Sequence, residues 1–264
     1  MVPPRRNWSH LTTADFETDT SGWIAILPIA ATEQHGPHLP TGTDTMIGEG
    51  LLERGIARFP DDLPALVLPT LSVGKSDEHD GFAGTLSLEA KTLIDVLEAY
   101  GDGVARAGVR KLVILNSHGG NSEAMGIAGR SLRIRHRMLV VATSWARLGY
   151  PAGLFSDDEI AHGIHAGDVE TSLMLAVKPG LVRRDQCRDF VSASVSMVDD
   201  FAVLRGHGRM AFSWTLKDLS ATGACGDASA ATAEKGEAAA DYAVGQFLGL
   251  LYDVHRFDLS RLAG

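Results

Sequence analysis

A carboxylate, two imidazoles and a second carboxylate lie close together near the N-terminus, as Glu33, His35, His38 and Asp44. In an extended segment, residues two apart point the same way, so Glu33 and His35 can converge. Asp44, at the start of the next predicted helix, could bridge two metal ions through its two oxygens. Mixed carboxylate and imidazole ligands without sulfur suit Zn²⁺, Mn²⁺ or Fe²⁺. The pattern predicts a metal site with His38 as a supporting residue; the alternative is a polar loop that caps the helix.

A second cluster follows an apolar run that ends at Asn116. His118 comes directly before Gly119 and Gly120, whose lack of side chains lets backbone or ligand approach closely. We expect His118 to bind metal. The alternative is a helix N-terminus that is merely capped by Asn121 or Ser117.

A third group of titratable residues lies around position 165. His165 comes just before a predicted helix and could act as a general acid or base, or hold substrate. Glu170 could complete a second metal site, although an acid in the first turn of a helix is also favoured by the helix dipole. His79, in the loop segment Glu78–Thr85, could line the same pocket or lie on the surface.

Short apolar runs alternate with longer segments of helical periodicity. Strands are expected at 23–29, 66–69, 111–116 and 138–143, and helices at 45–58, 89–107, from about 121, 169–177 and 231–254. This alternation predicts an α/β domain spanning residues 1–264, with parallel β-α-β units and helices on both faces of the sheet. Ligands bind beyond the carboxyl ends of such strands, where Glu33 and His118 follow. The segment 189–223 has no clear pattern.

The composition excludes some classes of function. The formal net charge of −9 argues against binding to nucleic acid, which needs a basic face. Two distant cysteines, Cys187 and Cys225, argue against a disulfide framework and favour a reducing cytoplasm. We see no signal peptide and no apolar stretch long enough to cross a bilayer. We therefore expect a cytoplasmic protein with no nucleic-acid or membrane partner.

Four segments together resemble the motifs of the creatininase (creatinine amidohydrolase) family. In chain order they are Glu33-Gln34-His35-Gly36-Pro37-His38-Leu39-Pro40 with Thr43-Asp44-Thr45, Phe82-Ala83-Gly84-Thr85, Asn116-Ser117-His118-Gly119-Gly120-Asn121, and His165-Ala166-Gly167-Asp168-Val169-Glu170-Thr171-Ser172-Leu173-Met174. Proline is usual in that family at the position of Ala83. The resemblance implies a three-layer α/β/α sandwich with a mostly parallel central sheet, usually assembled into a hexamer.

The resemblance also implies a dinuclear centre and roles for individual residues. Glu33 and His118 would bind one metal and His35 the other, while Asp44 would bridge them. His165 matches the acid/base histidine near the substrate. Zinc is expected first, with manganese or iron as alternatives. We therefore expect a homo-oligomer that binds two divalent ions per chain.

The sequence departs from creatininase itself around the substrate. The metal-binding histidine of the second motif is followed there by a tyrosine and a ligating glutamate, whereas this chain has Gly119 and Gly120. Glu170 could supply the missing carboxylate. A tryptophan–aspartate pair of the creatinine pocket aligns with Ala161-His162, and Trp145 matches another aromatic residue of that pocket. We therefore predict that His79, Gly119, Gly120 and Trp145 bind a substrate other than creatinine.

These observations predict a metal-dependent amidohydrolase that acts on a small-molecule amide. We class it with hydrolases of carbon–nitrogen bonds other than peptide bonds, with cyclic amides, formamides and short peptides as candidate substrates. Two metals would activate a water, and His165 would deliver a proton to the leaving nitrogen. The alternatives are a non-catalytic metal- or ligand-binding member of the fold and a serine hydrolase that uses Ser122, since Gly120-Asn121-Ser122-Glu123-Ala124 nearly fits a nucleophile elbow.

Overall fold

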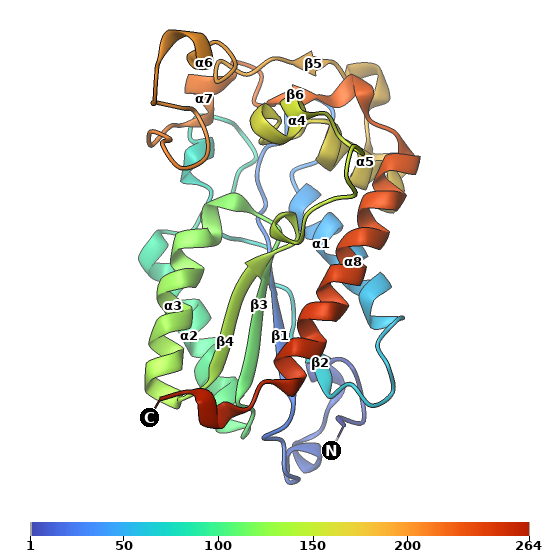
Figure 1. Cartoon of the computed structure of the whole chain (residues 1–264), viewed down its shortest axis with the longest axis vertical. Coiled ribbons are helices and arrows are strands. Elements are labelled where there is room, and N and C mark those ends of the chain that lie inside the picture. The colour runs from blue at the N-terminus through green and yellow to red at the C-terminus, as the bar shows by residue number, and fades with distance from the viewer. Residues whose placement is uncertain (1, 264) are drawn as a thin grey trace.

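Within residues 2–263, which the computed structural model describes, four parallel strands form the central sheet in the order β2-β1-β3-β4 (Figure 1). The strands are β1 (Ile24–Ile29), β2 (Ala65–Val67), β3 (Lys111–Asn116) and β4 (Leu139–Ser144). β1 and β3 pair along their whole length, with Ile29 opposite Asn116 at their carboxyl ends. The loops that follow these two strands therefore begin side by side.

β1, β2 and β3 are buried on both faces, as expected for parallel strands, whereas the edge strand β4 is half-buried. Side chains alternate along β1, so Ile24 and Ile26 belong to one apolar core while Ala25 and Leu27 belong to another. Such continuous apolar strands bury both faces only if helices cover each side. This is why β1 carries no polar side chain, and β3 is apolar from Leu112 to Leu115 before it ends at Asn116.

Helices cover the two faces and complete a three-layer α/β/α sandwich (Figure 1). One face carries α2 (Ala90–Arg106) and α3 (Ser122–His136). The other carries α1 (Thr43–Ile56), α5 (Asp168–Val177) and α8 (Ala233–Arg256). The predicted fold class is confirmed. Each of these strands and helices begins within two residues of the predicted start, and each one with a predicted end also ends within two residues of it.

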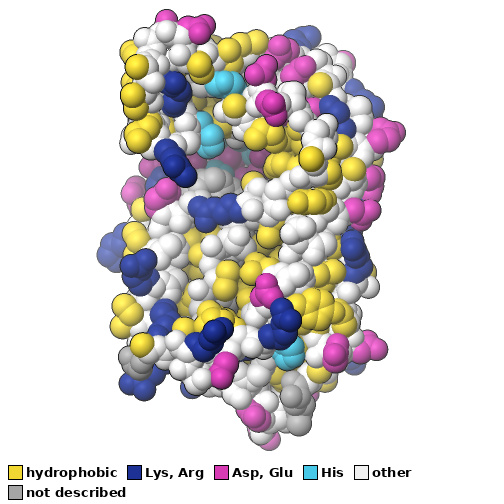
Figure 2. Space-filling model, viewed as in Figure 1, with side chains coloured by type: hydrophobic (Ala, Val, Ile, Leu, Met, Phe, Trp, Pro, Cys, Tyr) yellow, Lys and Arg dark blue, Asp and Glu magenta, His cyan; other side chains and the backbone are white. Residues whose placement is uncertain are grey.

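The segment that the sequence pattern did not assign lies beyond the carboxyl ends of the strands (Figure 1). It carries little regular structure: α6 (Met197–Asp200), α7 (Leu216–Leu219) and β5 (Asp189–Phe190), which pairs antiparallel with β6 (Gly226–Asp227). The short helix α4 (Asp157–His162) lies at the same end. Figure 2 shows apolar side chains over this region and histidines in the hollow beneath it. Among residues 2–263, no helix is long and apolar enough to cross a membrane.

Candidate metal centre

The predicted metal ligands from the first two motifs meet beyond the ends of β1 and β3. Glu33 and His35 lie in the loop after β1, Asp44 lies in the first turn of α1, and His118 follows β3. All four side chains are buried. Asp44 does not cap α1, because the N-cap residue is Gly42 and no side chain bonds the cap. Its carboxylate is therefore turned toward the histidines rather than toward the helix end.

Asp44 lies between two groups of candidate ligand atoms. Its Oδ2 is 3.3 Å from Nδ1 of His118, and that nitrogen is 3.1 Å from Oε1 of Glu33. Its Oδ1 is 3.2 Å from Nε2 of His35, which lies 3.8 Å from Oε2 of Glu170. One carboxylate thus faces two imidazoles with different oxygens, an arrangement that suits a ligand bridging two ions.

Backbone carbonyls fix which ring nitrogen of each histidine faces the centre. His118 donates its Nε2–H to the carbonyl oxygen of Lys75 at 2.8 Å, which leaves the Nδ1 lone pair directed at Glu33 and Asp44. His35 donates its Nδ1–H to the carbonyl oxygen of Glu33 at 2.9 Å, which leaves Nε2 directed inward. A metal-binding histidine is held in this way, with the second nitrogen hydrogen-bonded to a partner outside the centre.

The carboxylates of the centre face histidines, but three of their oxygens lack a hydrogen bond to any described residue. Among the described residues 2–263, both oxygens of Glu33 and Oδ2 of Asp44 are buried without a hydrogen bond of acceptable geometry. Buried carboxylates are normally hydrogen-bonded, paired or bound to metal. Ligand atoms about 2.05 Å from a tetrahedral zinc ion lie about 3.3 Å apart, close to the 3.1–3.3 Å separations around Asp44. The residues present therefore fit divalent metal ions.

The ionisable groups of the centre shift each other's pKa. Burial alone would lower the pKa of His35, but Asp44, Glu170 and Glu33 outweigh it and raise that pKa to about 9. For His118 burial is likewise outweighed, mainly by Glu33, and its pKa lies well above the usual value. Burial would raise the pKa of Glu33, yet His118 and its neighbours hold it well below the usual range. The centre strongly favours positive charge, which metal ions would supply in place of protons.

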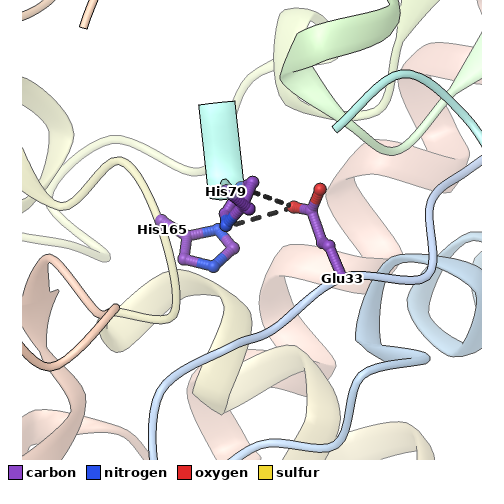
Figure 3. A group of neighbouring side chains, drawn as sticks. All are labelled: Glu33, His79 and His165. Atoms are coloured by element: carbon purple, nitrogen blue, oxygen red, sulfur yellow. Dashed lines mark ion pairs between the residues drawn. The ribbon is translucent and has the colours of Figure 1, made fainter. Parts of the chain in front are cut away.

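Two further histidines face Glu33, as Figure 3 shows. Nε2 of His79 lies 3.2 Å and Nδ1 of His165 lies 3.8 Å from Oε1 of Glu33. The rings of His79 and His165 are 4.5 Å apart between centroids, and His35 stacks obliquely on His165 at 4.2 Å. Burial, with the nearby His35 and His79, holds the pKa of His165 well below its usual value. The structure thus brings His79 into the centre rather than leaving it on the surface.

The backbone before α5 positions His165 and Glu170 together. Ala166 adopts a left-handed conformation with φ of 56°, which is unusual for a residue with a side chain. Its N–H donates to Oε2 of Glu170 at 2.6 Å, and its carbonyl accepts from Nε2 of His38 at 3.0 Å. His38 therefore holds the backbone of Ala166 without facing the proposed ligands, in keeping with the expected supporting role. Ala166 in turn fixes Glu170 next to His165.

Glu159 is a residue whose role the sequence did not indicate. This buried side chain of α4 accepts hydrogen bonds from the backbone N–H groups of Val169 at 3.2 Å and Asp227 at 3.0 Å. Its burial raises its pKa. Three glycines leave room for its carboxylate, because a Cβ on any of them would collide with it: Gly163, Gly167 and Gly226. Glu159 thereby joins α4, the start of α5 and β6.

Glu78 was also missed, although it directly precedes His79. Its Oε1 lies 3.3 Å from Nε2 of His118. A Cβ on Gly120 would lie 2.5 Å from that nitrogen and closer still to Oε1 of Glu78 and the carbonyl oxygen of Lys75. Gly120 therefore leaves space for a carboxylate that comes from another loop. The sequence carries only an indirect signal for Glu78: Gly120 stands where the creatininase motif has a ligating glutamate.

Two cavities meet at the centre. One, of about 360 Å³, is lined by Glu33, His79, Gly120 and His165, and by aromatic residues of the segment beyond the strands. The other, of about 400 Å³, is mainly apolar and reaches Trp145. Six residues line both: Ser117, His118, Gly119, Ile164, Glu170 and His207. His207, to which the sequence analysis gave no role, thus borders the site.

The serine hydrolase alternative finds no support in this geometry. Ser122 begins α3 and lines the apolar cavity. Among residues 2–263, no hydrogen bond joins its hydroxyl to a histidine, whereas a catalytic serine needs an adjacent base.

Comparisons with known proteins agree with the geometry. The family model for creatininase, described as creatinine amidohydrolase, matches residues 9–251. The mycofactocin precursor peptide peptidase of Mycobacterium ulcerans (strain Agy99) is 35% identical over 222 residues, which cover 82% of this chain and 80% of that protein. The creatinine amidohydrolase of Pseudomonas putida is 35% identical over 196 residues, or 68% and 74% of the two chains.

Solved structures of creatininase show the same fold. A glutamate-to-glutamine mutant of the Zn–Zn type superposes with a TM-score of 0.75 at 27% identity, covering 95% of this chain and 98% of that one. Creatininase in a manganese form gives a TM-score of 0.74 at 25% identity, covering 96% and 99%. The match over most of the sequence and the shared fold lead to one conclusion: this chain belongs to the creatininase family.

Proposed function

We propose that this chain is a hydrolase of amide-type carbon–nitrogen bonds that works with two divalent metal ions. Glu33, Asp44 and His118 would hold one ion, and His35, Asp44 and Glu170 the other. The observation that carries the proposal is the pair of buried carboxylates, Glu33 and Asp44. Oε1 of Glu33 and Oδ2 of Asp44 have no hydrogen bond among the described residues, and both face Nδ1 of His118. Zn²⁺ and Mn²⁺ are the ions named for the solved relatives.

The metal ions, when bound, would lower the pKa of a water and polarise the amide carbonyl. His165 supplies the proton transfer: its Nε2–H is held by the carbonyl oxygen of Gln34, so Nδ1 of the neutral ring faces the centre and can accept a proton from the attacking water. The same nitrogen then returns the proton to the departing amine. His79, Gly119, Gly120 and Trp145 line the two cavities and are proposed to bind the substrate.

The substrate is proposed to be a short peptide or another extended amide rather than creatinine. The two cavities together offer more room than one small ring needs, and the second is mainly apolar. The mycobacterial relative is named for a peptide substrate, which extends the candidates beyond the non-peptide bonds suggested by the sequence. Peptides with an apolar residue beside the scissile bond would fill both cavities.

We further propose that the chain acts as one hydrolase domain and associates with copies of itself. Exposed apolar side chains cluster in one stretch of the segment beyond the strands: Val191, Val195, Val198, Phe201, Val203, Leu204 and Met210. A patch of this kind marks an interaction surface in a soluble protein. Light scattering on the purified protein tests the association, and a monomer at all concentrations would contradict it.

Metal analysis of the purified protein tests the proposed function. We expect about two transition-metal ions per chain in the wild type and a large loss in Asp44→Ala, because Asp44 faces both groups of ligands. Asp61→Ala, on the exposed surface, is the matched control and should keep the metal. Hydrolysis of a panel of formamides, cyclic amides and short peptides should depend on the metal. Wild type that takes up no metal, or turns over no amide when loaded, would overturn the proposal.

A further inference from the structure

The side-chain amide of Gln34 has a fixed orientation inside the site. The backbone N–H of Gly36 donates to Oε1 of Gln34 at 2.9 Å, and Nε2 of Gln34 donates to the carbonyl oxygen of Gly223 at 2.9 Å. Gly223 has φ of 79° and a Cβ there would collide with Oε1 of Gln34, so that glycine leaves the amide its place. The oxygen and nitrogen of the amide therefore cannot exchange positions without placing donor against donor.

This orientation decides which nitrogen of His79 carries the proton. The second amide hydrogen of Gln34 points at Nδ1 of His79, at 2.9 Å. An amide nitrogen can only donate, so Nδ1 of His79 must accept, and a neutral ring then carries its proton on Nε2. That Nε2–H faces Oε1 of Glu33 at 3.2 Å, but not in hydrogen-bond geometry (Figure 3). It is therefore a donor directed into the centre that a substrate oxygen can use.

The backbone carbonyl of Gln34 fixes the proton of His165 on the nitrogen that points away from Glu33. His165 donates its Nε2–H to the carbonyl oxygen of Gln34 at 2.7 Å. A neutral His165 then has its lone pair on Nδ1, which lies 3.8 Å from Oε1 of Glu33 (Figure 3). Two neighbouring histidines that face the same oxygen of Glu33 (Figure 3) thus present a donor and an acceptor. Both assignments come from Gln34.

We propose that Gln34 is a positioning residue that assigns opposite proton roles to His79 and His165 during amide hydrolysis; this rests on the proposed function. His165 Nδ1 accepts a proton as the water oxygen bonds to the carbonyl carbon. The electron pair of the C=O bond moves to the oxygen, which His79 Nε2–H stabilises by a hydrogen bond. The electron pair on the oxygen then re-forms the C=O bond as the C–N bond breaks, and the proton on His165 Nδ1 passes to the departing nitrogen, which restores both rings.

The tautomers can be measured directly on the wild-type protein. Nitrogen NMR of the ¹⁵N-histidine-labelled protein, loaded with diamagnetic Zn²⁺, distinguishes protonated from unprotonated ring nitrogens, and His79→Asn and His165→Asn identify the two sets of signals. We expect His79 to be protonated on Nε2 with a bare Nδ1, and His165 to be protonated on Nε2. A proton on Nδ1 of His79 would overturn the proposal, whatever the variants do.

Substitution of Gln34 tests the consequence for catalysis. Gln34→Glu replaces the donor by an acceptor, and Gln34→Met removes the donor without adding charge. In both we expect kcat on the amide substrate to fall by ~10²-fold, with KM and metal content little changed, because the donor role of His79 is lost. Gln246→Glu, on the exposed face of α8, is the control for added charge and should match the wild type.

The outcomes separate this proposal from the proposed function. If both Gln34 variants fold and keep the wild-type kcat, the proton roles are wrong even though the enzyme is an amidohydrolase. If the wild type binds metal but hydrolyses no amide, the proposed function fails, while the nitrogen spectra still decide whether Gln34 sets the two tautomers.

Discussion

Replacement of Gly120 by alanine places a methyl group where the structure has no room. The new Cβ would lie 2.5 Å from Nε2 of His118, at least 0.5 Å inside the 3.0 Å that real Cβ contacts respect. It would be closer still to the carbonyl oxygen of Lys75, which holds His118 in place, and to Glu78. Because one of these contacts is with backbone, the strain cannot be relieved by rotating a side chain.

The expected result is weaker metal binding. Disturbing the partners that orient a ligating histidine lowers metal affinity 10–100-fold, or by about 1.4–2.8 kcal/mol. The matched control is Gly119→Ala, because a Cβ on Gly119 meets nothing within 4 Å and that residue belongs to the same short 3₁₀ helix. Both substitutions restrict the unfolded chain by a similar amount, so this effect cancels in the comparison.

Competition with a chelator of known affinity measures the difference. Metal-free wild type, Gly120→Ala and Gly119→Ala are titrated with Zn²⁺ in the presence of the chelator, and urea unfolding of each metal-free protein reports the fold. If Gly120→Ala binds Zn²⁺ as tightly as Gly119→Ala, the packing of Lys75 and Glu78 against His118 does not control the site, and the reasoning is refuted.

Three other substitutions test residues outside the proposed set of metal ligands. Glu159→Ala leaves the N–H groups of Val169 and Asp227 without their partner and should lower the free energy of unfolding by about 2–4 kcal/mol in urea; a loss below about 0.5 kcal/mol would contradict this. Burial lowers the pKa of His38 to about 4, so between about pH 6.5 and 4 the unfolded chain binds a proton that the folded chain does not. Stability should therefore fall by up to about 3 kcal/mol on acidification, and His38→Gln should remove that part of the slope. Ser122→Ala should keep nearly full amide turnover in steady-state assays, whereas its abolition would revive the serine hydrolase alternative.

The sequence predicted the sheet and the main helices because their signal is local. The run Leu112–Leu115 is apolar throughout and is followed by the polar Asn116, which marks both the strand and its carboxyl end. The same logic placed Glu33 and His118 near each other, since β1 and β3 are neighbours that end at the same level. The residues brought together at the centre were therefore predictable from motif and topology.

The supporting contacts were not predictable, because they join distant segments. Gln34 bonds to Gly223, 189 residues away, in a region without a periodic pattern. Glu159 looks from the sequence like an ordinary acid in the first turn of a short helix, and only the folded chain surrounds it with glycines. Glu78 can approach His118 only because Gly120 has no side chain, since a Cβ there would collide with the Glu78 carboxylate. Such roles depend on tertiary packing, which propensity and spacing do not encode.

The centre draws its ligands from loops that are far apart along the chain, and this has a consequence for the lifetime of the protein. The hydrogen bond from His165 to the carbonyl oxygen of Gln34 spans 131 residues, so it forms only when the fold is nearly complete. Metal then binds the native state in preference to the unfolded chain, and stabilises it by about 4 kcal/mol at a free concentration 1,000 times the Kd. A chain starved of metal is thus expected to open more often and to be degraded sooner, so that metal supply sets the abundance of the protein as well as its activity.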